Sequence, residues 1–291
     1  MFTRTNANGS TLPTAVFNAM EAALSTLLDH GTGNGSVLAT AASIGCEEII
    51  RLYLLIGADI NARGGPCCRT GLEGAALSGH ESIVKLLLEG GPDISASGEF
   101  DGTALHIAAM NGHANVVECL LNNGADINAI HRGIGTPLQG AVTWHGKDVE
   151  GMVKLLLDCG ADVKTNAGET GNALQAAATT GNMEIVKLLI EHGADVNDGG
   201  GENDSPLIAA AKEGHKHIAD LLVEKGAEVN KLFGGLGTAL VGAVLADKDE
   251  MVRFLLEKGA DHYLKGEEYV SARKLAVAKG KLWLFAGGMN R

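Results

Sequence analysis

A short segment that recurs at a near-constant spacing constrains the fold of this chain more than any other feature. Residues 124–128 read Gly-Ala-Asp-Ile-Asn. The acidic residue of this segment recurs, 33 to 36 residues apart, at Asp59, Asp93, Asp126, Asp162, Asp195, Glu228 and Asp261. A second marker, which starts each unit, recurs at Ser36, Thr70, Thr103, Thr136, Asn172, Ser205 and Thr238. Two markers that keep phase over seven units predict a repeat protein built from stacked units.

Each unit has the sequence pattern of two short helices. Residues 103–109 predict a first helix, which Thr103 can cap and which Gly112 ends. In two other units Pro137 or Pro206 stands just inside the first turn, where a helix does not need the missing N–H. A second helix follows, as at residues 185–190, with apolar residues at helical spacing. A glycine-rich turn then leads to the next unit.

These segments together resemble the motif of the ankyrin repeat family. The matching segments are Thr-Ala-Leu-His at 103–106, Gly-His at 112–113, Thr-Pro-Leu-Gln at 136–139 and Gly-Ala-Asp-Val-Asn at 193–197. The resemblance covers about residues 10–286, and it extends more loosely to the glycine-rich arrays of filamentous fungi. It implies an all-α ankyrin-repeat solenoid of stacked helix-turn-helix pairs, with β-hairpin or turn fingers on one side.

The phase of the repeat predicts the domain organisation. We expect an N-terminal tail at residues 1–9 and a single repeat domain at 10–291, with units starting near residues 10, 36, 70, 103, 136, 172, 205, 238 and 271. The first unit, with Leu12 on an apolar helical position, lacks its finger, and the last has a second helix that stops short near Phe285. Both ends therefore resemble caps. Met1 and a capped first unit favour a complete folded body, and a piece of a larger protein is the alternative.

The charge and the cysteines limit the classes of partner and compartment. A formal net charge of −12 without a local basic cluster argues against nucleic-acid binding. We expect no signal peptide and no membrane span, because no stretch of apolar residues is long enough. Five cysteines without a C-x-x-C pair argue against a zinc site and favour a reducing, intracellular compartment, cytoplasmic or nuclear. We expect no metal and no cofactor.

No sequence motif for catalysis is present. Phosphate-binding loops, H-E-x-x-H and G-x-S-x-G are all absent from the sequence. The stacking of first helices would align four polar side chains as a ladder, in which a carboxylate beside an imidazole could act as acid and base: Glu73, His106, Gln139 and Gln175. The repeat explains them equally well as hydrogen-bonding partners of the turns. Three further histidines, His80, His113 and His215, occupy a structural position of the family.

The family geometry places two residues after the alanine pair of each first helix on the concave groove. Over the first five units these positions include an apolar series, Phe17, Ile44, Leu77, Met110 and Trp144, together with the polar Asn111. A row of exposed apolar residues predicts a contact surface. The alternative is that some of them pack against a neighbouring finger.

Trp144 is the strongest single candidate. It precedes an insertion of three residues, and the preceding finger carries His131 and Arg132. Tryptophan, arginine and histidine together suit a peptide or a planar ligand. Arg69 and Phe100 in earlier fingers are further candidates, and residues 232–236 form an apolar tip in a late one. For the fingers, the competing explanation is that each stacks on its neighbour.

The sequence therefore predicts a non-catalytic binding module. We expect it to bind another protein through the groove and fingers, as a monomer, without nucleic acid or membrane. The alternative is a small-molecule-binding protein or a non-classical enzyme that uses the same groove.

Overall fold

The computed structural model describes residues 3–5, 11–13, 34–64, 69–98, 101–143, 148–169, 171–199, 205–233, 237–265 and 271–288. The chain divides into two compact units, each of which contains several repeats. From here on, the first unit is Met1–Ala129 and the second unit is Ile130–Arg291, and they are described separately.

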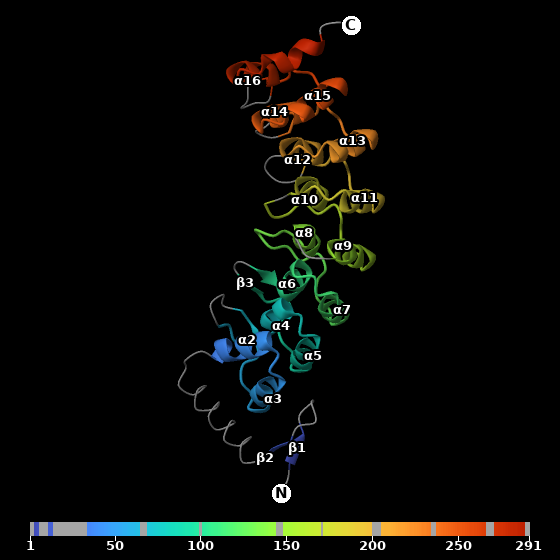
Figure 1. Cartoon of the computed structure of the whole chain (residues 1–291). Helices are drawn as coiled ribbons and strands as arrows, with labels where there is room; N and C mark the ends of the chain where they lie inside the picture. The colour runs from blue at the N-terminus through green and yellow to red at the C-terminus, as the bar shows by residue number, and fades with distance from the viewer. Residues whose placement is uncertain are drawn as a thin grey trace. The chain divides into compact units, whose positions relative to one another are not determined.

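The first unit contains helices in consecutive pairs. They are α2 (Asn34–Ile44), α3 (Glu47–Leu55), α4 (Gly71–Ser78), α5 (Glu81–Glu89), α6 (Ala104–Met110) and α7 (Ala114–Asn122). The first helices pack in the order α2, α4, α6, and the second helices pack in the order α3, α5, α7 (Figure 1). Short strands β3 (Ser97–Gly98) and β4 (Gly102–Thr103) pair as an antiparallel hairpin between α5 and α6.

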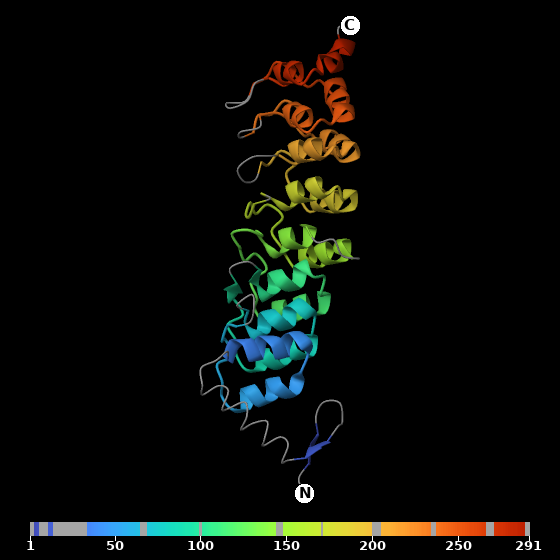
Figure 2. The ribbon, with the colours of Figure 1, turned by 60° about the vertical axis from the view of Figure 1, so that its left-hand side comes forward.

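The second unit repeats this arrangement. Its helices are α8 (Pro137–Thr143), α9 (Val149–Asp158), α10 (Ala173–Thr180), α11 (Met183–Glu191), α12 (Pro206–Glu213), α13 (Lys216–Glu224), α14 (Ala239–Leu245), α15 (Asp249–Glu257), α16 (Ala272–Ala278) and the 3₁₀ helix η1 (Leu282–Gly288). The turns between pairs project beyond the helix ends (Figure 2). The structure confirms the predicted all-α repeat of stacked helix pairs with hairpin turns.

The beginning of the chain differs from the expectation. Residues 11–13 form strand β2 (Thr11–Pro13), which pairs antiparallel with β1 (Thr3–Thr5), at the place where we expected a helix with Leu12 on its apolar face. Leu12 precedes Pro13, and the residue before a proline is pushed towards extended backbone. The rest of the expected first helix pair lies outside the described residues.

Side chains of the unit-starting marker cap the first helices. Thr70 and Glu73 form a capping box on α4, in which Thr70 Oγ1 accepts the Glu73 N–H and a Glu73 carboxylate oxygen accepts the Thr70 N–H at 2.6 Å. In the second unit, Asn172 accepts the Gln175 N–H at 2.8 Å, and Ser205 caps α12. This explains why the marker is restricted to Ser, Thr and Asn.

The Asp-x-Asn marker connects successive turns. Asp195 accepts the N–H of Asn197, and the side-chain oxygen of Asn197 accepts the N–H of Glu228 in the next turn. Asn230 repeats this contact to the N–H of Asp261. The marker therefore recurs because one side chain shapes its own turn and also binds the next one.

Small side chains let the first helices approach each other closely. Ala75 and Ala76 on α4 are fully buried, and a Cβ added at Gly74 would stand 2.6 Å from the carbonyl oxygen of Ala39 on α2. Such close packing leaves little room for rings in the interior. This agrees with an aromatic content of only 4%.

Candidate partner-binding surfaces

Three of the predicted groove residues lie at the two positions that follow the alanine pair in the first unit, with Leu77 and Met110 at the first position and Ile44 at the second. Ile44, Leu77 and Met110 end α2, α4 and α6 or stand in their last turn, and these helices pack on one another in that order. Ile44 is 68% exposed, while Leu77 and Met110 are half-buried. We call these three residues the helix-end surface. Their apolar side chains form a series that is accessible to water and is not buried in the core.

Histidines of the following repeat hold the backbone at this surface. Nε2 of His80 contacts the carbonyl oxygen of Ser43 at 3.1 Å, and Nε2 of His113 contacts that of Leu77 at 3.0 Å. The side-chain amide of Asn111 donates to Ile107 O at 2.7 Å, so this predicted contact residue closes the end of α6. The carbonyl groups at the surface are thus partly satisfied within the repeat.

The equivalent positions on α10 and α12 of the second unit are polar. Thr179 and Thr180, at the end of α10, are exposed, and their hydroxyls donate to carbonyl oxygens of their own helix at 3.0 and 3.1 Å. Lys212 and Glu213 occupy the same place on α12. The same backbone therefore presents an apolar series on α2, α4 and α6 and polar side chains on α10 and α12, while Leu245 at the end of α14 is apolar and half-buried.

Several predicted contact residues lie outside the described residues. They are Phe17, Phe100 and Trp144, with the adjacent residues 145–147. The two candidates of the preceding finger are described. His131 pairs with Gly135 across a short antiparallel bridge, and Arg132 is exposed at its tip. The proposed cluster of these two with Trp144 stays a prediction.

The fingers contact one another, as the competing explanation held. Arg69 pairs with Asp101 of the next finger at 2.6 Å, which gives this predicted binding residue a partner within the protein. Similarly, the ring of Phe233 lies where a Cβ on Gly199 of the preceding turn would stand. Leu232 beside it remains 49% exposed.

Three of the four polar residues considered as a ladder, Glu73, His106 and Gln139, bond to turns, whereas the buried side-chain oxygen of Gln175 has no hydrogen-bond partner among the described residues. His106 is fully buried, and its Nδ1 lies 2.9 Å from Thr103 Oγ1. Gln139 accepts the Thr136 N–H at 2.7 Å and donates to the carbonyl oxygen of Gly171. Arg63 pairs with Glu73 at 3.2 Å. Such contacts fix turn geometry and provide no nucleophile or oxyanion site.

The described residues were also compared with the requirements of a metal site and of a membrane-spanning helix. Among them no group of three or more His, Cys, Asp or Glu side chains is placed to hold a metal ion. None of the helices in the described part of the chain has the length and apolarity that a bilayer crossing needs. Burial raises the pKa of the Cys119 thiol, which makes it a poor nucleophile at neutral pH.

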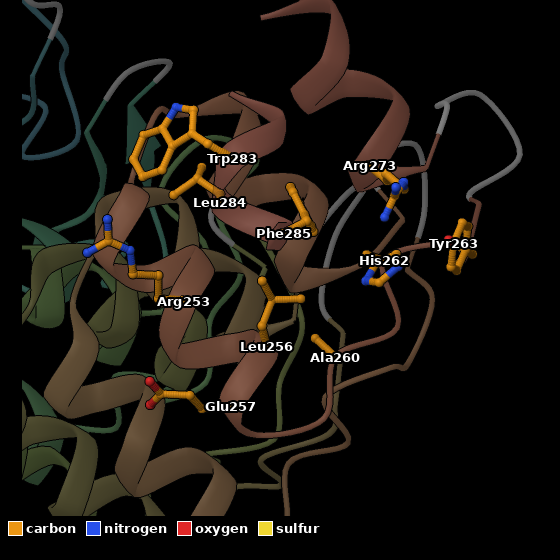
Figure 3. Close-up of a pocket in the computed structure, with 10 residues that line it drawn as sticks. All are labelled: Arg253, Leu256, Glu257, Ala260, His262, Tyr263, Arg273, Trp283, Leu284 and Phe285. Atoms are coloured by element: carbon orange, nitrogen blue, oxygen red, sulfur yellow. The ribbon is translucent and has the colours of Figure 1, made fainter. Parts of the chain in front are cut away.

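The sequence reasoning missed a pocket at the end of the second unit. A cavity of about 710 Å³ lies between α15, the turn after it, α16 and η1 (Figure 3). We call it the C-terminal pocket. Its lining includes His262, Tyr263 and Trp283. The sequence contained one signal of this pocket, because Tyr263 stands at the position where most repeats have the turn asparagine.

The comparisons with known proteins agree with this geometry. A family model for ankyrin repeats, in three copies, matches residues 38–131, 72–167, 138–233 and 202–266. The chain belongs to the ankyrin repeat family. It is similar to the crystal structure of the human ASB11 ankyrin repeat domain, with 27% identity and a TM-score of 0.65, over 78% of this chain and 99% of that chain. No curated protein matches the sequence. Ankyrin repeat domains generally mediate protein–protein interaction.

Proposed function

We propose that this ankyrin repeat protein is a non-catalytic binding module that holds a partner protein on the helix-end surface of its first unit. The observation that carries the proposal is the exposed apolar series at Ile44, Leu77 and Met110. Apolar side chains that a scaffold leaves in water favour a contact with another protein, where hot spots are apolar and clustered. The same positions on α10 and α12 of the second unit are polar and provide no such series.

The backbone of the surface also suits binding without a large ordering cost. The ends of α2 and α4 are held by hydrogen bonds from His80 and His113. A surface that is already ordered loses little conformational entropy on association. The side chains of Leu77 and Met110 are half-buried, so their rotamers are restricted before a partner arrives.

The experiment places a photoreactive benzophenylalanine at either of two matched positions. Ile44 and Thr180 occupy the same repeat position and are both exposed. In an extract of the native cells we expect the residue at position 44 to cross-link to a defined protein and the residue at position 180 not to do so. Equal labelling from both positions, or labelling from position 180 alone, would contradict the assignment of the surface.

A further inference from the structure

Two arginines of the C-terminal pocket each stack on an aromatic ring. The guanidinium carbon of Arg253 lies 5.4 Å from the centre of the Trp283 ring, and that of Arg273 lies 5.5 Å from the centre of the Tyr263 ring. Figure 3 shows the two pairs at opposite sides of the pocket, with Leu256, Ala260 and Phe285 between them. The pocket thus combines an apolar middle with a cation on each side.

Neither guanidinium is neutralised within the described part of the chain. No described carboxylate lies within salt-bridge distance of Arg253 or Arg273. By contrast, Lys258 pairs with Asp220 at 2.8 Å, and Lys281 pairs with Asp249 at 2.7 Å. An arginine stacked on a ring keeps its planar set of N–H donors available for a carboxylate. The two arginines are therefore the pocket's available anion-binding groups.

One carboxylate, that of Glu257, also belongs to the lining. It lies at the lower edge of the view in Figure 3, on the side of Arg253 and away from Arg273. A ligand that carries anions at both arginines must keep a neutral group near Glu257. The pocket therefore favours separated negative charges over a single dense one.

Exposed apolar side chains extend beyond the lining. Tyr263 and Trp283 are 61% and 52% exposed, and Val277 on α16 and Leu282 on η1 are 55% and 42% exposed. Val277 stands one helical turn after Arg273 on α16, and Leu282 directly precedes Trp283 on η1. A small molecule of pocket size would leave both side chains in water. A protein segment can cover them as well as the pocket, which favours a macromolecular occupant.

We propose that the C-terminal pocket binds an acidic segment of a partner protein, in which an apolar side chain is flanked by carboxylates. The apolar side chain packs on Leu256, Ala260 and Phe285, and the flanking carboxylates pair with Arg253 and Arg273. His262 packs its ring against Phe285, with centroids 5.5 Å apart, and supports this floor. The site lies wholly in the second unit, so the proposal for this pocket and the proposal for the helix-end surface can be tested independently.

The test uses two peptides and one reporter. The first probe is an acetylated peptide with a leucine–phenylalanine pair between glutamates, and the second replaces each glutamate by glutamine. The chain has two tryptophans, so Trp144→Phe leaves Trp283 as the only fluorescent indole. We expect the acidic peptide to change the Trp283 emission saturably and to bind at least about tenfold more tightly than the amide peptide, since charge-assisted hydrogen bonds exceed neutral ones. Added salt should weaken this binding.

Matched variants separate the pocket from net charge. Arg253→Gln with Arg273→Gln should lower the affinity for the acidic peptide by about tenfold or more. Arg51→Gln with Lys85→Gln removes the same charge from two exposed first-unit side chains and should leave the affinity unchanged. Circular dichroism checks that both variants are folded.

Four results would overturn the proposal. Equal affinity of the two peptides would remove the role of the carboxylates, and full binding by the arginine variant would remove the role of the pocket. Binding of a naphthalene carboxylate without binding of either peptide would make the pocket a small-molecule site. Concentration-dependent self-association that Trp283→Ser abolishes, again without peptide binding, would make a second copy the occupant.

Discussion

The two units of this protein share one repeat but differ at the residues that end the first helix of each pair. The first unit has Ile44, Leu77 and Met110 there. The second unit has the polar pairs Thr179–Thr180 on α10 and Lys212–Glu213 on α12, and it has Leu245 on α14. The buried positions do not differ in this way, because fully buried leucines occupy the same place in both units. The comparison teaches that packing fixes the interior of the repeat, while the helix ends are free to carry a function.

The largest expected effect tests whether the two interiors are equivalent. Leu120 on α7 and Leu189 on α11 occupy the same repeat position and have no exposed surface. Leu120→Ala and Leu189→Ala should each lower the free energy of unfolding by about 2–5 kcal/mol, because each leaves a cavity in a close-packed core. Chemical denaturation followed by circular dichroism measures both. A large cost in one unit and almost none in the other would break the equivalence.

A smaller effect is expected at the glycines between paired helices. Gly79 and Gly181 have φ angles of 74° and 81°, and a Cβ on either would stand 2.5 or 2.6 Å from the ring of His113 or His215. Replacing either glycine by alanine should cost about 1–3 kcal/mol in all, from the left-handed backbone strain and from displacement of the histidine.

Gly124 is the matched control for these glycines. Its φ is 87°, and nothing lies within 4 Å of an added Cβ. Gly124→Ala should therefore cost only the left-handed strain, about 1 kcal/mol. If this substitution costs as much as those at Gly79 and Gly181, the histidine contact is irrelevant to the turn.

The smallest expected effect is a pH dependence of the stability that arises at the C-terminal end of the second unit. Hydrogen bonds from Lys279 and then Lys281, at 2.8 and 3.0 Å, hold the pKa of Asp247 below its ordinary value. Because the folded pKa is the lower one, this stabilisation is present above the unfolded pKa of a carboxyl group and is lost as the pH falls through the folded value.

Asp247→Asn tests this assignment. Asn tolerates the positive φ of 58° at this position, so the change removes mainly the charge. The variant should lose less stability than the wild type when the pH is lowered from neutral into the acid range, and the urea midpoint at each pH measures this. The contribution is small because the pair is exposed. If the urea midpoints of the wild type and the variant fall equally as the pH is lowered, Asp247 does not have this role.

Most of the fold could be predicted because the residues that cap the helices and form the turns recur at fixed positions from repeat to repeat. The marker at Thr70 caps a helix, as predicted, and the structure adds that the marker at Asp195 shapes a turn. The strand at residues 11–13 was missed, because helical spacing alone gave no weight to Pro13 and its effect on Leu12. Local backbone restriction prevailed there over apolar periodicity.

The candidate sites were less predictable than the fold. The sequence identified the equivalent positions of Ile44, Leu77 and Met110, but it could not show how far each is covered. The C-terminal pocket was missed because Arg253 and Trp283 lie thirty residues apart in segments without a repeat marker. Only the packing of η1 on α15 brings them together. Tertiary contacts of the last helix pair carry no periodic signal.

The most direct test of the account is the affinity of the protein that cross-links at position 44. It should be titrated against the wild type, a first-unit variant (Ile44→Ser, Leu77→Ser, Met110→Ser) and a second-unit variant (Thr180→Ala, Lys212→Ala, Glu213→Ala). The account predicts that the first-unit variant loses at least about 2 kcal/mol of binding free energy, roughly thirtyfold in affinity, and that the second-unit variant binds like the wild type. Undiminished binding by a folded first-unit variant, or an equal loss in both variants, would contradict it.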